Sequence, residues 1–343
     1  MRQMTIAKLL EQYPFVSDFF RENRLEINGF ENMTFPEYLA RLTQEELEDK
    51  AINAQALPDE LESYISQMRE FLGLEKSSPV QSLTILPGHN KSGEAEQFEQ
   101  LEILTSQIVS IVGPTGSGKS RLLADIEWAA QGDTPTGRSI LINGLPPDPK
   151  WRYSSNNRLV AQLSQNMNFV MDISAGEFVR LHAESRMVER PGKIAEKVLE
   201  AANHLAGEAF ISGTPVTSLS GGQSRALMIA DTAILSVSPI VLIDEIENAG
   251  IDRRKALELL VSQDKIVLMA THDPLLALMA DRRIVIRNGG IHTVLETSAG
   301  EKELLKELDK IDGVMQNARN MLRAGRALGG KKLLNKIETN RER

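Results

Sequence analysis

Three different spacings of hydrophobic residues divide the chain into three parts. Over the first 75 residues apolar side chains recur at helical intervals, and nine of the chain's sixteen aromatic residues lie there. Pro14 interrupts one apolar stripe, and Thr43 with Glu46 has the spacing of a capping box. Pro58 opens a segment whose apolar residues share one helical face: Leu61, Tyr64, Ile65, Met68 and Leu72. We predict a small all-helical domain over residues 1–75, with a core of its own.

From residue 76 to residue 296 the pattern is that of an α/β domain. Short β-branched runs alternate with helical spacing, which is typical of a parallel sheet covered by helices. The clearest predicted strands are Ile108–Val112, Ile240–Ile243 and Lys265–Ala270. Two further apolar runs, 284–287 and 291–295, flank Asn288-Gly289, which predicts a hairpin turn. The sheet is therefore expected to be mixed, with one antiparallel pair near the end of the domain.

The third part, residues 297–343, combines one helix with a basic tail. Apolar residues at alternating steps of four and three form a coiled-coil type of stripe: Leu304, Leu308, Ile311, Met315, Ala318 and Leu322. Two interpretations stay open, a helix folded back onto the α/β domain or a stripe for docking or dimerisation. The tail beyond is typical of a solvated end and contains Arg326, Lys331, Lys332, Lys336, Arg341 and Arg343.

Composition narrows the class of protein. With 343 residues, 41% of them hydrophobic, the chain can bury a sizeable core. Having no cysteine, it can form neither disulfides nor a cysteine-ligated metal site, which suits a reducing compartment. We see no uninterrupted apolar run of roughly 18 residues or more and predict a cytoplasmic protein. A net charge of -8 disfavours general affinity for nucleic acid or anionic membranes.

One glycine-rich segment has the form of a phosphate-binding loop. It follows the predicted strand Ile108–Val112, precedes a helical run over Arg121–Ala130, and reads Gly113, Pro114, Thr115, Gly116, Ser117, Gly118, Lys119 and Ser120. Glycines let backbone amides point at phosphates, and the following helix N-terminus favours negative charge. We expect Lys119 to reach the β- and γ-phosphates of a nucleotide and Ser120 to offer its hydroxyl to Mg²⁺.

A second motif narrows the nucleotide-binding class. The run Leu219, Ser220, Gly221, Gly222 and Gln223 matches the signature of the ATP-binding cassette family, and the chain resembles this family over roughly residues 80–296. Four further segments resemble family motifs in the family's order: a Q-loop at Gln165, a Walker B strand ending in Asp244 and Glu245, a D-loop ending at Asp252, and a switch histidine at His272.

The resemblance implies a fold, an activity and roles for these residues. The fold would be a P-loop NTPase of the cassette type, with a helical signature subdomain over about residues 166–222. The activity would be hydrolysis of Mg-ATP to ADP and phosphate. Glu245 would orient the attacking water, His272 would hold the γ-phosphate, and Gln165 and Asp244 would join Ser120 around Mg²⁺. Arg121, on the helix after the loop, also belongs to the predicted nucleotide-binding residues.

The signature motif implies a dimer. By the resemblance, Ser220 and Gly222 of one subunit cover the γ-phosphate bound by the other subunit, and Asp252 of the D-loop segment belongs to the predicted nucleotide-binding set. ATP then joins two cassettes head to tail, and hydrolysis separates them. Because this chain holds a single cassette, the partner would be a second copy or another cassette chain.

Three positions depart from the common family pattern. The family usually stacks adenine on an aromatic residue before the phosphate loop, yet between Ser77 and Ser110 only Phe98 is aromatic, with His89 as another platform. Weaker stacking would leave adenine affinity modest, since such contacts are worth about 1–3 kcal/mol. Arg121 stands where threonine is common, and Asp231 where an arginine of the signature helix is common.

Two hypotheses on biological role follow, and a third is disfavoured. The first is a cassette ATPase that remodels or activates a partner protein, motivated by the helical N-terminal segment and the C-terminal stripe. The alternative is the ATP-binding subunit of a membrane transporter, peripheral to the membrane through membrane domains on other chains. A nucleic-acid machine would call for long coiled arms or a basic groove, and the sequence predicts neither.

Overall fold

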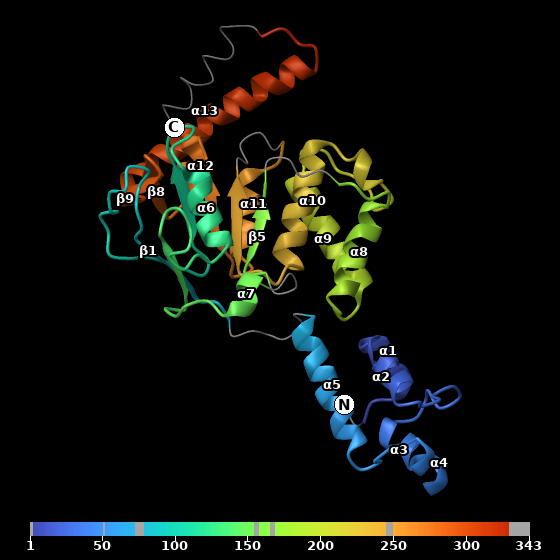
Figure 1. Ribbon diagram of the computed structural model, residues 1–343. Coiled ribbons are helices and arrows are strands. Elements are labelled where there is room, and N and C mark those ends of the chain that lie inside the picture. Colours follow the sequence, from blue (N-terminus) through green and yellow to red (C-terminus); the bar gives the residue numbers. More distant parts are fainter. Residues whose placement is uncertain are drawn as a thin grey trace. The chain divides into compact units, whose positions relative to one another are not determined.

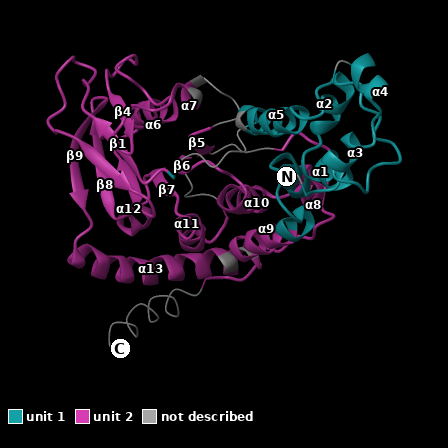
Figure 2. Ribbon diagram, turned by 90° about the horizontal axis from the view of Figure 1, so that it is seen from below, with its two compact units in different colours: residues 1–79, 154–157, 179–195 teal, residues 80–153, 158–178, 196–343 magenta. Residues whose placement is uncertain are grey.

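A computed structural model describes residues 3–50, 52–72, 79–153, 158–164, 169–244 and 250–328. The chain divides into two compact units, shown in two colours in Figure 2. The first comprises residues 1–79, 154–157 and 179–195, and the second comprises 80–153, 158–178 and 196–343. The domain boundaries expected at residues 75 and 296 stay predictions.

The N-terminal part of the first unit is built from five short helices. Their bounds are α1 (Ile6–Gln12), α2 (Val16–Glu22), α3 (Phe35–Leu39), α4 (Gln44–Asp49) and α5 (Leu57–Phe71). Local sequence signals set several of these ends. Pro14 lies between α1 and α2, and the capping box predicted at Thr43 and Glu46 is confirmed at the start of α4. A second capping box, formed by Thr34 and Glu37, begins α3.

Aromatic side chains dominate the core of these helices. Phe19, Phe20, Phe35 and Tyr38 are each at most 5% exposed and pack with leucine and isoleucine side chains from α1 and α5. The rings of Phe20 and Phe35 lie 5.4 Å apart in a tilted arrangement. The prediction of a separate aromatic core in this part of the chain is confirmed.

The second unit contains two sheets (Figure 1). The smaller one is antiparallel, in the order β2 (Leu101–Leu104), β1 (Ser82–Leu86) and β4 (Ser139–Ile142). The larger sheet is mixed, in the order β5 (Val160–Leu163), β6 (Ile240–Asp244), β7 (Ile266–Ala270), β3 (Ile108–Val112), β8 (Arg282–Arg287) and β9 (Gly290–Glu296). Its strands are parallel apart from the antiparallel pair β8 and β9.

The central strands of the larger sheet are buried on both faces, which explains their continuous apolar sequence. Side chains alternate along each strand. Ile240 and Leu242 of β6 therefore join a core shared with the smaller sheet and α6, whereas Val241 and Ile243 join a second core with α10 and α11. This sequence thus builds two hydrophobic layers, one on each side of a single sheet.

The remaining helices cover the sheets or extend from them. In chain order they are α6 (Lys119–Glu127), α7 (Pro149–Tyr153), α8 (Ala175–Ser185), α9 (Pro191–Leu205), α10 (Gly221–Ile234), α11 (Arg253–Val261), α12 (Pro274–Met279) and α13 (Ala299–Arg323). A 3-10 turn, Val216–Ser218, precedes α10. Helices α8 and α9 each contribute residues to both units.

The sequence predicted five of the nine described strands, β3, β6, β7, β8 and β9, and gave no prediction for β1, β2, β4 and β5. Where predicted and observed bounds differ, the causes are local. The predicted helix 121–130 begins at Lys119 and ends at Glu127, because the backbone turns to positive φ at Ala129. Strand β7 begins one residue later than expected, and the Lys265 ammonium donates to the backbone oxygens of Ser236 and Ser238. The hairpin at Asn288-Gly289 is confirmed, with φ of 47° and 82°, as a type I′ turn requires.

The last described helix, α13, packs against the second unit along part of its surface. It contacts α12, and Figure 2 shows it running past the ends of α12 and α11. Three arginines of the unit bind its acidic residues, in the pairs Arg283–Glu301, Arg254–Asp309 and Arg253–Asp312. The helix is therefore folded back onto the α/β unit, yet most of its predicted apolar stripe faces outward.

Candidate nucleotide-binding site

Three neighbouring strands of the larger sheet end at the same edge. Strand β3 pairs in parallel with β7, and β7 pairs in parallel with β6. In this register Ala270 aligns with both Ile111 and Asp244. The loop after β3, the residues after β7 and the last residue of β6 therefore emerge at the carboxyl edge of adjacent strands, where α/β proteins place their ligands.

The loop after β3 is folded so closely that only glycine fits at two of its positions. Gly113 has a φ of 155°, and a Cβ there would lie 2.5 Å from the backbone oxygen of Ile286. Gly118 has a φ of 111°, and a Cβ there would lie 2.7 Å from the Cα of Gly289. At Gly116, with φ of 77°, the space is open but the backbone still favours glycine. The loop matches the cradle that the sequence predicted.

Lys119, the first residue of α6, is 9% exposed and turns its ammonium back onto the loop. Its Nζ donates to the backbone oxygen of Gly113 at 2.9 Å and lies 3.0 Å from Nε2 of His272. Since an ammonium can only donate, the Nε2 of His272 must act as the acceptor in this contact. The structure thus brings together Lys119 and His272, which stand 153 positions apart in the chain.

Donors and acceptors around the loop fit phosphate groups. The hydroxyl of Ser117 is buried without a hydrogen-bond partner among the described residues, and Ser120 is exposed at the start of α6. Asp244 ends β6 at the same edge of the sheet. Hydroxyl and carboxylate oxygens are ligands that Mg²⁺ accepts beside the phosphates of its substrate. The residues present therefore fit a nucleotide with its metal ion.

Two contacts from outside the phosphate loop support it, and neither is predicted by a local sequence pattern. The Lys91 ammonium donates to the backbone oxygen of Gly116 at 2.8 Å, and the Gly289 amide donates to that of Ser117 at 2.6 Å. The backbone amide of Lys91 in turn donates to the backbone oxygen of Asn288 at 2.7 Å. The Asn-Gly pair signalled a hairpin, but nothing in its sequence indicated that the turn would rest against the phosphate loop.

Behind these supports lies a buried cluster of three charges. Arg138 is fully buried and contacts Glu96 at 2.6 Å and Asp125 of α6 at 2.8 Å. It also donates to the backbone oxygen of Gly289 at 3.0 Å. Burial alone would raise the pKa of Glu96, but hydrogen bonds from Arg138 and from two backbone amides hold that pKa below its ordinary value. Burial opposes ionisation of Arg138 as well, yet Glu96 and Asp125 raise its pKa.

The predicted signature motif forms the N-terminus of α10. Ser220 is the N-cap, its hydroxyl accepts from the amide of Gln223, and the Gln223 side chain accepts from the Ser220 amide. Gly221 and Gly222 form the first turn, and the Cα of Gly222 lies 3.6 Å from where a Cβ of Gly250 would stand. The signature and the residues just before Asp252 are thus neighbours within the chain.

The predicted D-loop and switch-histidine segments are joined by one arginine. Asp252 is the N-cap of α11, and Asp273, directly after His272, is the N-cap of α12. Arg253 binds Asp273 and also binds Asp312 of α13 at 2.9 Å. No sequence pattern singled out this arginine, because its two partners lie 20 and 59 positions away.

Two predicted site residues lie outside the described residues. These are Gln165, expected at the Mg²⁺ ion, and Glu245, expected beside the attacking water. Their assignments therefore stay predictions, as do the roles assigned to the described site residues.

Comparison with known proteins decides the family. Residues 99–248 match the family model described as ABC transporter. An uncharacterized ABC transporter ATP-binding protein of Methanocaldococcus jannaschii is 50% identical over 249 residues, which cover 73% of this chain and 95% of that protein. The chain belongs to the ATP-binding cassette family.

More distant relatives and solved structures are of the same kind. A cobalamin import ATP-binding protein of Halobacterium salinarum is 28% identical over 200 residues, covering 55% of this chain and 48% of that protein. The cbiO1 structure of Clostridium perfringens, part of an ABC transporter complex, is 21% identical, with a TM-score of 0.48, and covers 72% of this chain and 98% of that one. Because the chain belongs to the family through its 50% identical relative, the expected fold class and ATPase activity hold for this cassette protein.

The cassette departs from its family where adenine would bind. Phe98 is half-buried and packs against the core that the two sheets share. His89 is exposed, with its ring beside Gly137. Of the two platforms named from the sequence, His89 is therefore the more exposed.

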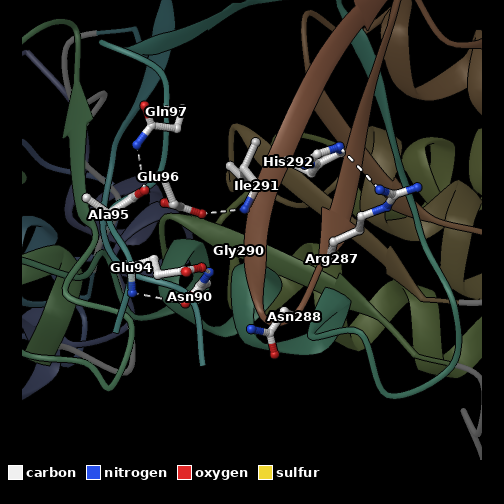
Figure 3. A pocket seen from close by; sticks show the side chains of 10 residues that line it. All are labelled: Asn90, Glu94, Ala95, Glu96, Gln97, Arg287, Asn288, Gly290, Ile291 and His292. Atoms are coloured by element: carbon white, nitrogen blue, oxygen red, sulfur yellow. Dashed lines mark hydrogen bonds between the residues drawn. The ribbon is translucent and has the colours of Figure 1, made fainter. Parts of the chain in front are cut away.

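An open pocket lies between the loop that contains Asn90 and the β8–β9 hairpin (Figure 3). It has a volume of about 490 Å³ and is lined by the loop 90–97 and the β8–β9 hairpin. None of its lining residues belongs to the phosphate loop, and Glu96 in its wall is already bound to Arg138 and Ile291. The pocket therefore lies among the residues that support the phosphate loop and is not part of the phosphate site itself.

Within the described residues, no helix combines the length and apolar character needed to cross a lipid bilayer.

Proposed function

We propose that this cassette protein is the ATP-binding subunit of a membrane transporter whose membrane-spanning domains lie on other chains. Relatives whose names give a role are described as import ATP-binding proteins or transporters, which supports this role over the remodelling of a partner protein. In this role the chain would lie in the cytoplasm, held at the membrane by its partner. The cargo is a matter for experiment, since the 50% identical relative is itself uncharacterized.

The observation that carries the ATPase part is the contact between Lys119 and His272. It joins the phosphate loop after β3 to the segment after β7, at the edge where β6 ends in Asp244. In phosphoryl transfer most of the catalytic work is positioning and charge stabilisation. We assign the triphosphate to Lys119 and the loop amides, and the γ-phosphate to His272 as well.

The remaining site residues receive the roles that their family motifs imply. Ser120, Asp244 and Gln165 would hold Mg²⁺, which would neutralise charge on the β- and γ-phosphates. Glu245 would accept a proton from the attacking water or orient it. Thr115, Gly116 and Ser117 would contribute backbone amides, and Arg121 would lie on the first turn of α6.

The dimer would complete the site. The signature helix α10 has 14 residues, and its first turn is capped by Ser220 with exposed Gly221 beside it. Such a helix start favours negative charge. In a head-to-tail dimer, Ser220, Gly221, Gly222 and Gln223 of one subunit would cover the γ-phosphate held by the other, with Asp252 nearby. The second subunit would be another copy or a related cassette chain.

Exposed apolar side chains in the helical segment support a membrane-protein partner. Val170 is 94% exposed, Ile211 75% and Met171 46%, and all three lie in the segments that flank α8 and α9. Large apolar side chains exposed on a domain surface often mark protein contacts. We assign this surface to the membrane-spanning partner.

Two experiments test the proposal at its two levels. For the ATPase, Lys119→Ala should abolish ATP hydrolysis, and Glu245→Gln should retain ATP binding while accumulating an ATP-dependent dimer. Normal turnover in either variant would contradict the assigned site.

For the transporter role, the tagged full-length chain is purified from detergent-solubilised membranes and its partners are identified by mass spectrometry. We expect a protein with several membrane spans, and its loss in Val170→Asp/Ile211→Asp. Lys306→Gln/Lys310→Gln, on the distant helix α13, should retain it. Recovery of only non-membrane partners, with ATPase activity intact, would favour the remodelling hypothesis instead.

A further inference from the structure

Four of the six apolar residues in the stripe of α13 are left about half exposed by the fold, whereas Leu308 is partly buried and Ala318 is buried. Leu304 is 51% exposed, Ile311 49%, Met315 50% and Leu322 59%, and the four share one side of a helix with 25 residues. At 1.5 Å per residue the stripe runs for about 27 Å. The acidic residues that attach the helix to the rest of the second unit, Glu301, Asp309 and Asp312, lie on other faces. The packing of α13 thus leaves Leu304, Ile311, Met315 and Leu322 open to another surface.

The stripe is symmetric about its own midpoint. Leu304 and Leu322 stand nine residues before and after Gly313, and Ile311 and Met315 stand two residues before and after it. A twofold axis through the middle of the stripe would therefore set Leu304 against Leu322 of a second copy, and Ile311 against Met315. Such a surface is complementary to itself when two helices meet in opposite directions, as an isologous interface requires.

The charges on α13 favour the same arrangement. Residues 299–312 contain five acidic residues and three lysines, a net charge of -2. Residues 313–328 contain three arginines and no acidic residue, a net charge of +3. Parallel helices would bring like-charged halves together, whereas antiparallel helices bring the acidic half of each chain beside the basic half of the other.

The place of α13 in the second unit fits a contact between two copies. Arg253 and Arg254, at the start of α11, bind Asp312 and Asp309. That start of α11 also carries Asp252, which the proposed function places at the interface of two cassettes. The middle of α13, near Gly313, is therefore held beside Asp252, the residue expected to face a second chain.

We propose that two copies of this protein associate through antiparallel pairing of their α13 stripes, independently of nucleotide. The contact covers fewer than three heptads, so its affinity by itself is modest. It keeps two cassettes at a high effective concentration, so that ATP closes a pair that is already assembled. This inference goes beyond the proposed function, which requires only a dimer held by ATP.

The first test measures the mass of the full-length chain without nucleotide. Sedimentation equilibrium over a range of concentrations should show a monomer–dimer equilibrium. In Ile311→Asp/Met315→Asp the dissociation constant should rise at least about tenfold, because the contact would bury carboxylates. The control Lys306→Gln/Lys310→Gln makes the same change in net charge away from the stripe and should associate like the wild type. At a concentration at which the wild type is monomeric, thermal unfolding should be nearly unchanged in both variants, since Ile311 and Met315 are about half exposed.

The second test determines the direction of pairing and uses the absence of native cysteine. Chains carrying Leu304→Cys and Leu322→Cys, with different tags, are treated with a short bis-maleimide reagent, alone and mixed. Antiparallel pairing predicts a cross-linked species with both tags in the mixture and little product from either chain alone. Cross-linking of each chain with itself would indicate parallel pairing and would overturn the proposal.

Two further outcomes would also overturn it. One is a wild-type chain that stays monomeric without nucleotide at every concentration tested. The other is an Ile311→Asp/Met315→Asp variant that dimerises like the wild type. Neither outcome affects the proposed ATPase, whose failure would appear separately as normal turnover in Lys119→Ala. The two proposals are therefore tested apart.

Discussion

Two clusters of ion pairs hold two parts of the second unit in place, the phosphate loop and helix α13, and the clusters differ mainly in burial. Arg138 is fully buried and ties α6 and the β8–β9 hairpin together behind the phosphate loop. Arg253 and Arg254 form the other group and attach α13, with side chains that are 20% and 52% exposed. Both groups join segments that are far apart in the sequence. One lies in a dry interior, and the other lies at the water boundary.

The difference shows how burial changes what an ion pair does. Removing one partner of a buried pair leaves a desolvated charge without compensation, which is costly. Removing one partner of an exposed pair leaves a charge that water solvates readily. We therefore expect the Arg138 cluster to determine whether the phosphate loop keeps its shape, and the α13 pairs to adjust the position of a helix that folds without them.

The largest effect should come from Arg138→Met. This change leaves Glu96 and Asp125 buried without their cation and should lower the free energy of unfolding by about 3–5 kcal/mol. Both tryptophans, Trp128 and Trp151, lie in the second unit, so their fluorescence during urea unfolding reports on this unit. ATP affinity should also fall, because Arg138 binds Gly289, which supports the phosphate loop. Unchanged ATP affinity in a folded variant would contradict the supporting role.

A triple replacement sharpens this prediction. Arg138→Met combined with Glu96→Gln and Asp125→Asn removes all three charges, so it should recover most of the lost stability. If it instead remains as unstable as Arg138→Met alone, packing rather than charge accounts for the loss.

A smaller effect is expected for Arg253→Gln. Two charged hydrogen bonds are lost in a partly exposed place, and the unfolding free energy should fall by about 1–2 kcal/mol. Because Arg253 binds Asp273 beside His272, ATP turnover should fall several-fold with little change in ATP affinity. Steady-state kinetics separates the two quantities. A variant with unchanged turnover would show that Arg253 serves only to attach α13 through Asp312.

Arg254→Met should have a still smaller effect, within about 0.5 kcal/mol, because its partner Asp309 is also exposed. Arg254→Met is therefore a matched control for Arg138→Met within the same unit. A loss of stability as large as that of Arg138→Met would show that burial does not decide the strength of these pairs.

The smallest expected effect concerns acid and the start of α13. Hydrogen bonds from Ser298 and Arg283 lower the pKa of Glu301 from 4.5 to about 2. The stabilisation by its ionised form is therefore complete above about pH 4.5 and is lost as the pH falls toward 2. The difference in urea stability between wild type and Glu301→Gln should shrink over this range. A difference that grows on acidification would have the wrong sign.

Much of the second unit could be predicted from local sequence because local physics determines it. The continuous apolar runs at β3, β6 and β7 read as strands buried on both faces, and the phosphate loop is recognisable from its glycines and Lys119. The hairpin at Asn288-Gly289 is set by two residues that tolerate positive φ. Because these strands were predicted to be parallel, their carboxyl ends were expected at the same edge of the sheet. The distances between the side chains there could not be predicted from local sequence patterns.

The supports of the site could not be predicted in the same way. Arg138 lies at the start of an ordinary apolar strand, and its partners Glu96 and Asp125 stand 42 and 13 positions away. Lys91, like many loop lysines, carries no local sign that it will bind the phosphate loop. Side-chain pairing across such separations depends on where the chain returns, which local propensity does not encode.

The sequence by itself determined that the chain has a phosphate loop, a signature motif and a C-terminal apolar stripe, because each depends on residue types at fixed short spacings. Only the tertiary structure decided which side chains are buried together. It placed Lys119 against His272, Arg138 behind the loop and Arg253 beside α13, and it left most of the stripe of α13 exposed. Short-range pattern sets conformation, whereas burial and charge pairing depend on contacts between distant segments.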